Sequence, residues 1–425
     1  MARGYDADLV EALRHVPIAP LEKGFGGPRH LSPVTASTLT GARTHERGGW
    51  LGSPRAALRE SSLRHNLESM ARYCASHGVE LYPHAKTTMA PQLVAAQLDG
   101  GATGITVATA TQARVFRSFG VVDVLIANEV TDPASVAWLA GVPSHEPDLT
   151  VSCYVDSLQG VELLDAAPRH GGAASPLPVL VELGHDGGRA GARTREAARA
   201  VADAVSRSSH LTLAGVAGYE GSLLAPTAEA TVAAARAFAE ELARFAAELL
   251  GSGQLDDRPM VTAGGSAYFD AVVDVLAGQP WRLVLRSGCY LTHDHGLYST
   301  VTPVARNRSG PSLVPALHVW GPVLSRPDAS TVIVGTGRRD VSSDAGAPVP
   351  VRGLGTAGPV DVEGAQVERV FDQHLVLRVP QGCDLAPGDE VELGISHPCT
   401  TFDKWRWLPV LDDDGVIVDV VRTLF

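Results

Sequence analysis

VDVLIAN at 122–128, LTVSCYVD at 149–156, LPVLVEL at 177–183 and LTLAGVAGY at 211–219 are short runs of almost wholly apolar residues. Segments with the spacing of helices separate these runs along the chain. Apolar strands that alternate with helices are typical of a parallel sheet that is buried on both faces. This part of the sequence therefore predicts repeated βα units.

The same pattern extends in both directions, from RAALRE at 55–60 to RLVLRSG at 282–288. Helical spacing is clearest at 62–77 and in the Ala-rich segment 227–250. About nine apolar runs between residues 54 and 290 favour a (β/α)8 barrel of the TIM type. A doubly wound open sheet is the alternative.

Beyond residue 298 the helical spacing stops. Pieces rich in β-formers, such as TVIVG (331–335) and EVELGIS (390–396), are separated there by turn sequences. We therefore expect three parts in the α/β chain. These are an N-terminal arm (1–50) that packs on the body or on a partner subunit, the barrel (51–298), and a C-terminal antiparallel β domain (299–425).

The composition is that of a globular chain that does not bind polyanions. The 425 residues are 45% hydrophobic and 19% charged, with a formal net charge of −12 and a pI of about 5.7. This acidity argues against nucleic acid and against an anionic membrane surface as partners. The five cysteines are odd in number and scattered, and the N-terminus lacks the apolar core of a signal peptide. We therefore expect a reducing, cytoplasmic location.

Lys86 follows an expected strand end in VELYPHAKTT (79–88), beside His84 and Thr87. In a parallel barrel the reactive side chains lie at the carboxyl ends of the strands. A lysine buried there has a lowered pKa and can form a Schiff base with an aldehyde cofactor. The alternative is an ordinary solvated lysine in a loop.

Glycine-rich turns follow the later apolar runs. Arg189 lies in GGRAG (187–191), and Tyr219 lies in GYEG (218–221). Glycine lets a ligand approach the backbone, arginine donates hydrogen bonds, and small residues before a helix leave N–H groups that bind an anion. Each turn alone is equally compatible with a plain β–α connection. The candidate residues of the last two turns are Gly264, Gly265, Ser266, Gly288 and Cys289.

His397 and Cys399 lie two residues apart in ISHPCTTFDKWR (395–406). On an extended segment both side chains would face one side, which suits an imidazole and a thiolate bound to one metal ion. Two nearby ligands would leave open positions for substrate, as in a catalytic site. The alternative is a hydrogen-bonded histidine beside a cysteine that is buried as a small hydrophobe.

Motifs of other enzyme classes are missing from the sequence. It contains no Walker A motif, no GxGxxG after a first strand and no GxSxG nucleophile elbow. Nucleotide-binding and serine-hydrolase functions therefore lose support.

Taken in order, PHAKT around Lys86, GGRAG, GYEG, AGGS (263–266), LRSGCYLTHD (285–294) and HPCTTFDKW (397–405) resemble one enzyme group. This group is the D-serine dehydratase / D-threonine aldolase-like (amino acid deaminase) group of the alanine-racemase-like, fold type III pyridoxal phosphate enzymes. The resemblance covers about residues 51–425 and implies a barrel joined to a C-terminal β domain.

The resemblance implies a role for each candidate residue. Lys86 would be the Schiff-base lysine, with His84 and Thr87 beside it, and Arg189 would lie near the pyridine nitrogen. Tyr219 would lie in the cofactor pocket, and His397 and Cys399 would hold a divalent metal ion. The phosphate would be held largely by backbone amides of Gly264, Gly265, Ser266, Gly288 and Cys289.

The resemblance also implies a reaction. The dehydratase branch has His-x-Cys where the aldolases have His-x-Asp, so Cys399 favours dehydration, and favours zinc over harder metals such as manganese. We expect a lyase that removes water from a D-3-hydroxy-amino acid such as D-serine, D-threonine or 3-hydroxyaspartate, with Lys86 as the base. The alternatives are an aldolase that releases glycine and an aldehyde, and a metal-independent racemase. Members of the group are commonly homodimers.

Overall fold

The computed structural model describes residues 4–27, 32–44, 50–167, 175–223, 225, 227–355 and 358–425. Parts of the expected arm (1–3, 28–31 and 45–49) lie outside the described residues. In the rest of the arm, α1 (Ala7–Glu11) and α2 (Ala36–Leu39) pack on the body. Tyr5 donates a hydrogen bond of 2.7 Å to Asp99, and the Gly41 N–H donates one of 2.8 Å to the carbonyl of Ile417.

Eight parallel strands form the first sheet, in the order β2-β9-β8-β7-β6-β5-β4-β3. The sheet closes into a barrel because Thr106 bridges His84, just after β2, with its N–H 3.0 Å from the carbonyl of Pro83. The predicted TIM-type barrel is confirmed. Its strands are β2 (Glu80–Leu81), β3 (Ile105–Val107), β4 (Asp123–Glu129), β5 (Thr150–Val155), β6 (Leu177–Leu183), β7 (Leu211–Gly218), β8 (Met260–Thr262) and β9 (Arg282–Leu285).

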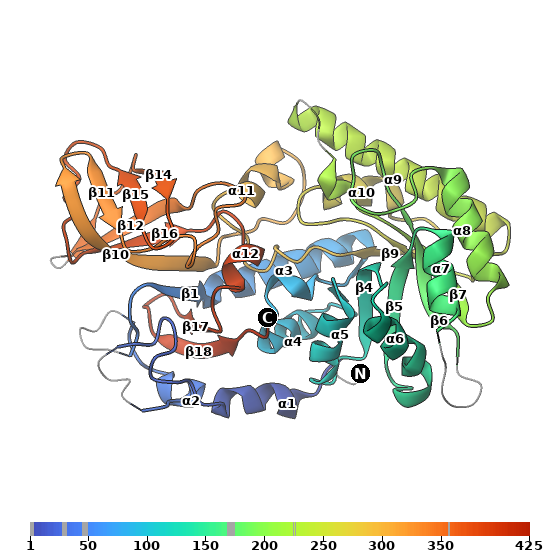
Figure 1. Cartoon of the computed structure of the whole chain (residues 1–425). Helices are drawn as coiled ribbons and strands as arrows, with labels where there is room; N and C mark the ends of the chain where they lie inside the picture. Colours follow the sequence, from blue (N-terminus) through green and yellow to red (C-terminus); the bar gives the residue numbers. More distant parts are fainter. Residues whose placement is uncertain are drawn as a thin grey trace.

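Helices follow the strands and cover the outside of the barrel (Figure 1). Several begin at a capping side chain that accepts a backbone N–H, such as Thr194 before α8 and Thr227 before α9. These helices are α3 (Glu60–His77), α4 (Pro91–Asp99), α5 (Ala110–Arg117), α6 (Pro133–His145), α7 (Leu158–Asp165), α8 (Arg195–Arg207), α9 (Ala228–Gly251) and α10 (Phe269–Leu276). No helix in the described part of the chain combines the length and apolarity needed to span a membrane.

The second sheet is largely antiparallel and has ten strands, with the main order β13-β12-β16-β10-β1-β17-β18. Strands β11, β14 and β15 extend it from β10. The expected C-terminal β domain is thus present beside the barrel (Figure 1). Its strands after residue 299 are β10 (Leu317–Asp328), β11 (Thr331–Val334), β12 (Val349–Gly355), β13 (Gly358–Val360), β14 (Gln366–Val370), β15 (Leu375–Arg378), β16 (Glu390–Gly394), β17 (Trp407–Leu411) and β18 (Ile417–Arg422).

The first apolar run of the predicted barrel lies in this second sheet. Strand β1 (Arg55–Arg59) pairs antiparallel with β10 and parallel with β17, so the expectation that RAALRE starts the barrel is wrong. Ala56, Ala57 and Leu58 are all buried, so β1 has two covered faces, as a barrel strand has. Its apolar pattern therefore could not tell which sheet it joins. The domain boundaries proposed from the sequence stay a prediction.

Candidate active site

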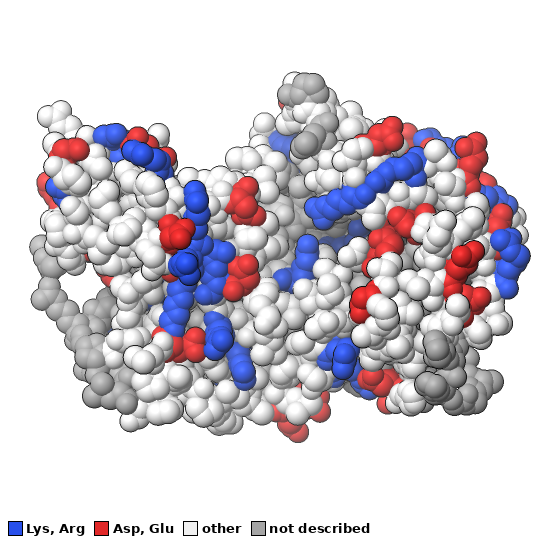
Figure 2. Space-filling view, in the orientation of Figure 1, with Lys and Arg blue, Asp and Glu red and all other residues white. Residues whose placement is uncertain are grey.

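A cavity of about 650 Å³ lies at the carboxyl ends of the barrel strands, against the segment that follows β16. Figure 2 shows a hollow between the two halves of the molecule, with Lys and Arg side chains at its edge. Of the twelve site residues predicted from the sequence, only Gly264 is not part of the lining. The eleven that line it are His84, Lys86, Thr87, Arg189, Tyr219, Gly265, Ser266, Gly288, Cys289, His397 and Cys399.

Lys86 is one of only three lysines in the chain. Lys23 pairs with Asp340 at 2.8 Å and Lys404 with Asp403 at 3.1 Å. Lys86 forms no ion pair with the described residues and is the lysine that lines the cavity. It lies on a 3₁₀ turn, Ala85–Thr87, directly after the seam where the barrel closes. Its backbone is therefore held next to the closure of the barrel, where the residue lines the cavity.

His84 lies beside this lysine in a buried setting. Burial, together with the charges of Lys86 and Arg286, holds the pKa of His84 well below its usual value, so its imidazole is neutral at pH 7. Its Nδ1 is buried without a hydrogen-bond partner among the described residues, as is the hydroxyl of Tyr154, which also lines the cavity. Two unpartnered polar atoms facing one cavity fit a polar ligand.

In the predicted phosphate cradle, three of the five backbone N–H groups already have an acceptor within the protein. The N–H groups of Gly264 and Gly265 donate to the buried carboxylate of Glu220 at 3.0 and 2.7 Å, so they are not free for an anion. Glu220 is a single acid in a neighbouring turn, and nothing in the sequence around it indicates this role. The N–H of Cys289 donates to Ser266 Oγ at 3.1 Å.

The remaining part of the cradle fits a phosphate better. The N–H groups of Ser266 and Gly288 have no hydrogen-bond acceptor within the described parts of the chain. A Cβ at position 288 would lie 2.6 Å from the carbonyl oxygen of His84, so only glycine fits there. Close backbone approach and free N–H groups are what anion binding at a turn requires.

Two arginines face the cavity. Arg189, the predicted partner of the pyridine nitrogen, lies with its Cζ 4.9 Å from the centre of the Tyr219 ring. Arg286 is buried and donates to Thr262 Oγ1 at 2.6 Å and to the carbonyl of Gly218 at 2.7 Å. It was not among the predicted site residues, although it directly follows strand β9 and lies in LRSGCYLTHD, a motif used for the resemblance. The assignment of Arg189 to the pyridine nitrogen stays a prediction.

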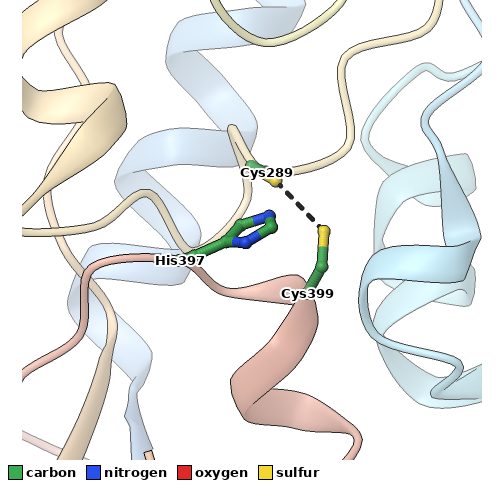
Figure 3. Close-up of side chains that lie close together, drawn as sticks. All are labelled: Cys289, His397 and Cys399. Carbon is green, nitrogen blue, oxygen red and sulfur yellow. Dashed lines mark hydrogen bonds between the residues drawn. The ribbon is translucent and has the colours of Figure 1, made fainter. Parts of the chain in front are cut away.

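His397, Cys399 and Cys289 form a cluster of three potential metal ligands (Figure 3). Their ligand atoms all lie within 4.8 Å of one another, and the two sulfurs are 3.6 Å apart. The expected extended segment is wrong, because Pro398 has helical dihedral angles and α12 (Cys399–Phe402) begins at Cys399. The histidine and the cysteine are brought together by a turn at Pro398 and not by an extended segment.

Neighbouring groups orient and charge this cluster. His397 Nδ1 donates to Asp344 Oδ2 at 2.8 Å, which leaves Nε2 as its ligand atom. Hydrogen bonding to Cys399, helped by Asp344, outweighs burial and raises the pKa of His397 to about 9. Hydrogen bonding from Cys289, helped by His397, outweighs burial and holds the pKa of Cys399 well below its usual value. The thiolate form is the one that binds metal ions.

Tyr298 is a site residue that the sequence did not identify. It lines the cavity, and its ring centre lies 6.4 Å from that of His397. The neighbouring sulfur atoms of Cys289 and Cys399, together with burial, raise the pKa of Tyr298, so its hydroxyl stays protonated. The carboxylate of Asp294 fixes this segment by accepting the N–H groups of Gly296 and Tyr298 at 3.0 and 2.9 Å. Tyr298 ends the stretch THDHGLY (292–298), which is the part of the sequence that could have indicated it. The two histidines of this stretch do not line the cavity.

The side chains around the cavity fit pyridoxal phosphate and a divalent metal ion. Lys86 offers an amine to an aldehyde, and Ser266 and Gly288 offer N–H groups to a phosphate. Arginine and tyrosine side chains offer a charged and an aromatic surface to a pyridine ring. One imidazole and two sulfurs form a donor set that zinc accepts.

Two protein families and several characterised proteins are similar to this chain. Residues 58–274 match the family described as "Alanine racemase, N-terminal domain", and residues 316–411 match the "Putative serine dehydratase domain". The D-threonine aldolase of Arthrobacter sp is 29% identical over 371 residues, which cover 87% of this chain and 91% of that protein. The D-threo-3-hydroxyaspartate dehydratase of Delftia sp. (strain HT23) is 31% identical over 141 residues, which cover 33% of this chain and 36% of that one.

A solved structure extends the likeness to the whole fold. The crystal structure of the D-threonine aldolase from Filomicrobium marinum superposes with a TM-score of 0.73 at 24% identity. The match covers 88% of this chain and 95% of that chain. The chain belongs to the alanine racemase N-terminal domain family, within the fold type III pyridoxal phosphate enzymes. It is an enzyme of the lyase class.

Proposed function

We propose that this chain is a pyridoxal phosphate- and metal-dependent lyase that eliminates water from a small D-3-hydroxy-amino acid. The products would be a 2-oxo acid and ammonia, and the candidate substrates are D-serine, D-threonine and 3-hydroxyaspartate. The observation that carries the proposal is that Lys86 lines the same cavity as His397 and Cys399. One substrate in this cavity reaches an amine and a metal site together.

Lys86, Ser266 and Gly288 would hold pyridoxal phosphate, and His397 and Cys399 would hold zinc. Pyridoxal phosphate, when bound, supplies the electron sink for breaking a bond at Cα, and zinc supplies a Lewis acid for the β-hydroxyl. Support for both comes from the free N–H groups at the cradle and from the sulfur and imidazole donor set.

The side chains of the chain would do the remaining work. The Nζ of Lys86 would take the Cα proton as general base. Asp344 would hold the His397 ring through its Nδ1–H, so that the imidazole cannot turn away from the cavity. Thr87, the residue after the lysine, lies with its Oγ1 3.3 Å from Cys399 Sγ and would keep the sulfur facing the cavity.

The second candidate is a retro-aldol lyase that gives glycine and an aldehyde. Relatives named as aldolases favour it, since the Arthrobacter protein matches over most of this chain. Cys399 favours dehydration, because the resemblance places His-x-Cys in the dehydratase branch and His-x-Asp in the aldolases. A homodimer and a cytoplasmic location stay predictions from the sequence.

Product analysis separates the candidates. Protein loaded with pyridoxal phosphate and zinc is incubated with D-serine, D-threonine or D-3-hydroxyaspartate, and 2-oxo acid, ammonia, glycine and aldehyde are measured. We expect oxo acid and ammonia, their loss with EDTA while the cofactor absorbance remains, and recovery with zinc. Glycine and aldehyde as the main products would replace the proposal by the aldolase. Full activity without metal would contradict the metal requirement.

A matched variant sharpens this test. Cys399→Asp keeps a zinc ligand at the same position, since carboxylate oxygen also binds zinc. We expect reduced elimination and a larger share of glycine and aldehyde in this variant. Cys399→Ala, which removes the ligand, is the control and should lose elimination without gaining the aldol products.

A further inference from the structure

Cys289 brings its sulfur into the metal site from a different part of the molecule than His397 and Cys399 do. It lies in the loop after barrel strand β9, whereas the other two lie after β16 of the second sheet. Figure 3 shows its side chain pointing toward His397 and Cys399. Its N–H is held by Ser266 Oγ in the phosphate cradle. The backbone of Cys289 therefore belongs to the phosphate cradle, and its sulfur belongs to the metal site.

The distance between the sulfurs fits a shared ion. Two thiolates bound to one tetrahedral zinc ion at about 2.3 Å lie about 3.8 Å apart. Cys289 Sγ and Cys399 Sγ are 3.6 Å apart, and Thr87 Oγ1 lies 3.9 Å from the first and 3.3 Å from the second. The other cysteines behave differently, since Cys74, Cys153 and Cys383 are buried outside the cavity lining.

We propose that Cys289 is a third protein ligand of the metal ion, so that the site is Cys2His with one open position. This deepens the proposed function and rests on its metal ion. Three protein ligands and one open position are the pattern of catalytic zinc sites, in which the open position takes water or substrate. The third ligand also ties the ion to the loop that carries Gly288, which fixes its position relative to the cofactor.

The ligand count is measurable on the unmodified protein. X-ray absorption at the zinc edge of the zinc-loaded protein should show two sulfur neighbours at about 2.3 Å. One sulfur neighbour would overturn the proposal. A disulfide between Cys289 and Cys399 in the zinc-loaded protein, detected by counting free thiols after denaturation, would overturn it as well.

Variants give a second, independent readout. Cobalt(II) replaces zinc and absorbs through thiolate-to-metal charge transfer, so the band reports the number of sulfur ligands. We expect Cys289→Ser and Cys399→Ser each to lose about half of this band. Cys289→Ser should also weaken zinc binding by more than the roughly 10–100-fold that changes outside the ligand set cost. Cys383→Ala, in the core of the second sheet, is the matched control and should change neither measurement.

The outcomes distinguish this inference from the proposed function. If Cys289→Ser keeps the full cobalt band and zinc affinity while Cys399→Ser loses them, the third ligand is refuted and the two-ligand metal site stands. If the unmodified protein binds neither ion, both the third ligand and the metal requirement of the proposed function fail.

Discussion

At the scale of single residues, the site depends on Lys86, which forms no ion pair with the described residues. Lys86 differs from the other two lysines, which form ion pairs with Asp340 and Asp403. Its neighbour His84 is kept neutral by burial and so does not add a positive charge beside the amine. A lysine in this setting is suited to carbonyl chemistry, which needs a free amine.

The first prediction concerns this lysine. Incubation with pyridoxal phosphate followed by borohydride reduction should label Lys86 alone, as found by peptide mapping. Lys86→Ala should lose the label and the cofactor absorbance, because no other lysine lines the cavity. Lys404→Ala is the control and should be labelled like the unmodified protein. Label on Lys23 or Lys404 in the unmodified protein would contradict the assignment.

At the scale of elements, a buried carboxylate joins the strands of the second sheet. Glu392 on β16 is 2% exposed and pairs with Arg59 of β1 at 2.8 Å and with His318 of β10 at 3.0 Å. Arg352 of β12 reaches the same carboxylate at 3.0 Å. Burial disfavours the charged form, but the neighbouring His318 and Arg59 outweigh it and hold the pKa of Glu392 at about 2.

This carboxylate should make the stability of the protein depend on pH. Its pKa is lower in the folded state than the ordinary value of 4.5, so the folded state holds this proton less tightly than the unfolded state. Its stabilisation is therefore complete above about pH 4.5 and is lost as the pH falls toward 2. A shift of this size corresponds to about 3 kcal/mol.

The second sheet supplies the variant for this test. Glu392→Gln should lower the free energy of unfolding at pH 7 by about 3 kcal/mol, as measured by urea denaturation. The difference from the unmodified protein should shrink as the pH falls from 4.5 to 2. Glu368→Gln, an exposed carboxylate on β14 that pairs with Arg378, is the control and should change stability little. A difference that does not depend on pH would contradict this account.

At the scale of the whole molecule, the two sheets are not consecutive units of the chain. Strand β1 precedes the barrel, yet it lies between β10 and β17 in the second sheet. Residues 312–425 alone lack this central strand, so their sheet would expose the edges of β10 and β17 to water. The second sheet is therefore built from segments that come both before and after the barrel in the sequence.

This arrangement makes a prediction about fragments. A fragment of residues 312–425 should not fold, and its amide NMR spectrum should show the narrow dispersion of an unfolded chain. A fusion that adds residues 50–60 through a flexible linker should recover dispersed signals, because it restores the missing strand. A fusion carrying Ala57→Asp, which places a charge at a buried position of β1, is the control and should stay unfolded. Dispersed signals from the fragment alone would contradict the prediction.

The sequence predicts the barrel well because its strands are apolar runs bounded by turns. Eight of its apolar runs are barrel strands, and eleven predicted site residues line one cavity. Features that depend on residues far apart in the sequence could not be predicted from it. Nothing local to β1 indicates its sheet, nothing in GYEG indicates that Glu220 takes two amides, and nothing near Cys289 indicates that its sulfur meets Cys399.

The position of β1 also sets an order of events during synthesis. The barrel has all of its strands once residue 285 has left the ribosome, and domains fold as they emerge. Strand β1 is synthesised first, but it cannot pair until β10 and then β17 have been made, and β17 ends at residue 411. The nascent chain therefore has Lys86 and the phosphate cradle in place before His397 and Cys399 exist. We expect the newly made protein to acquire its cofactor pocket first and its metal site last.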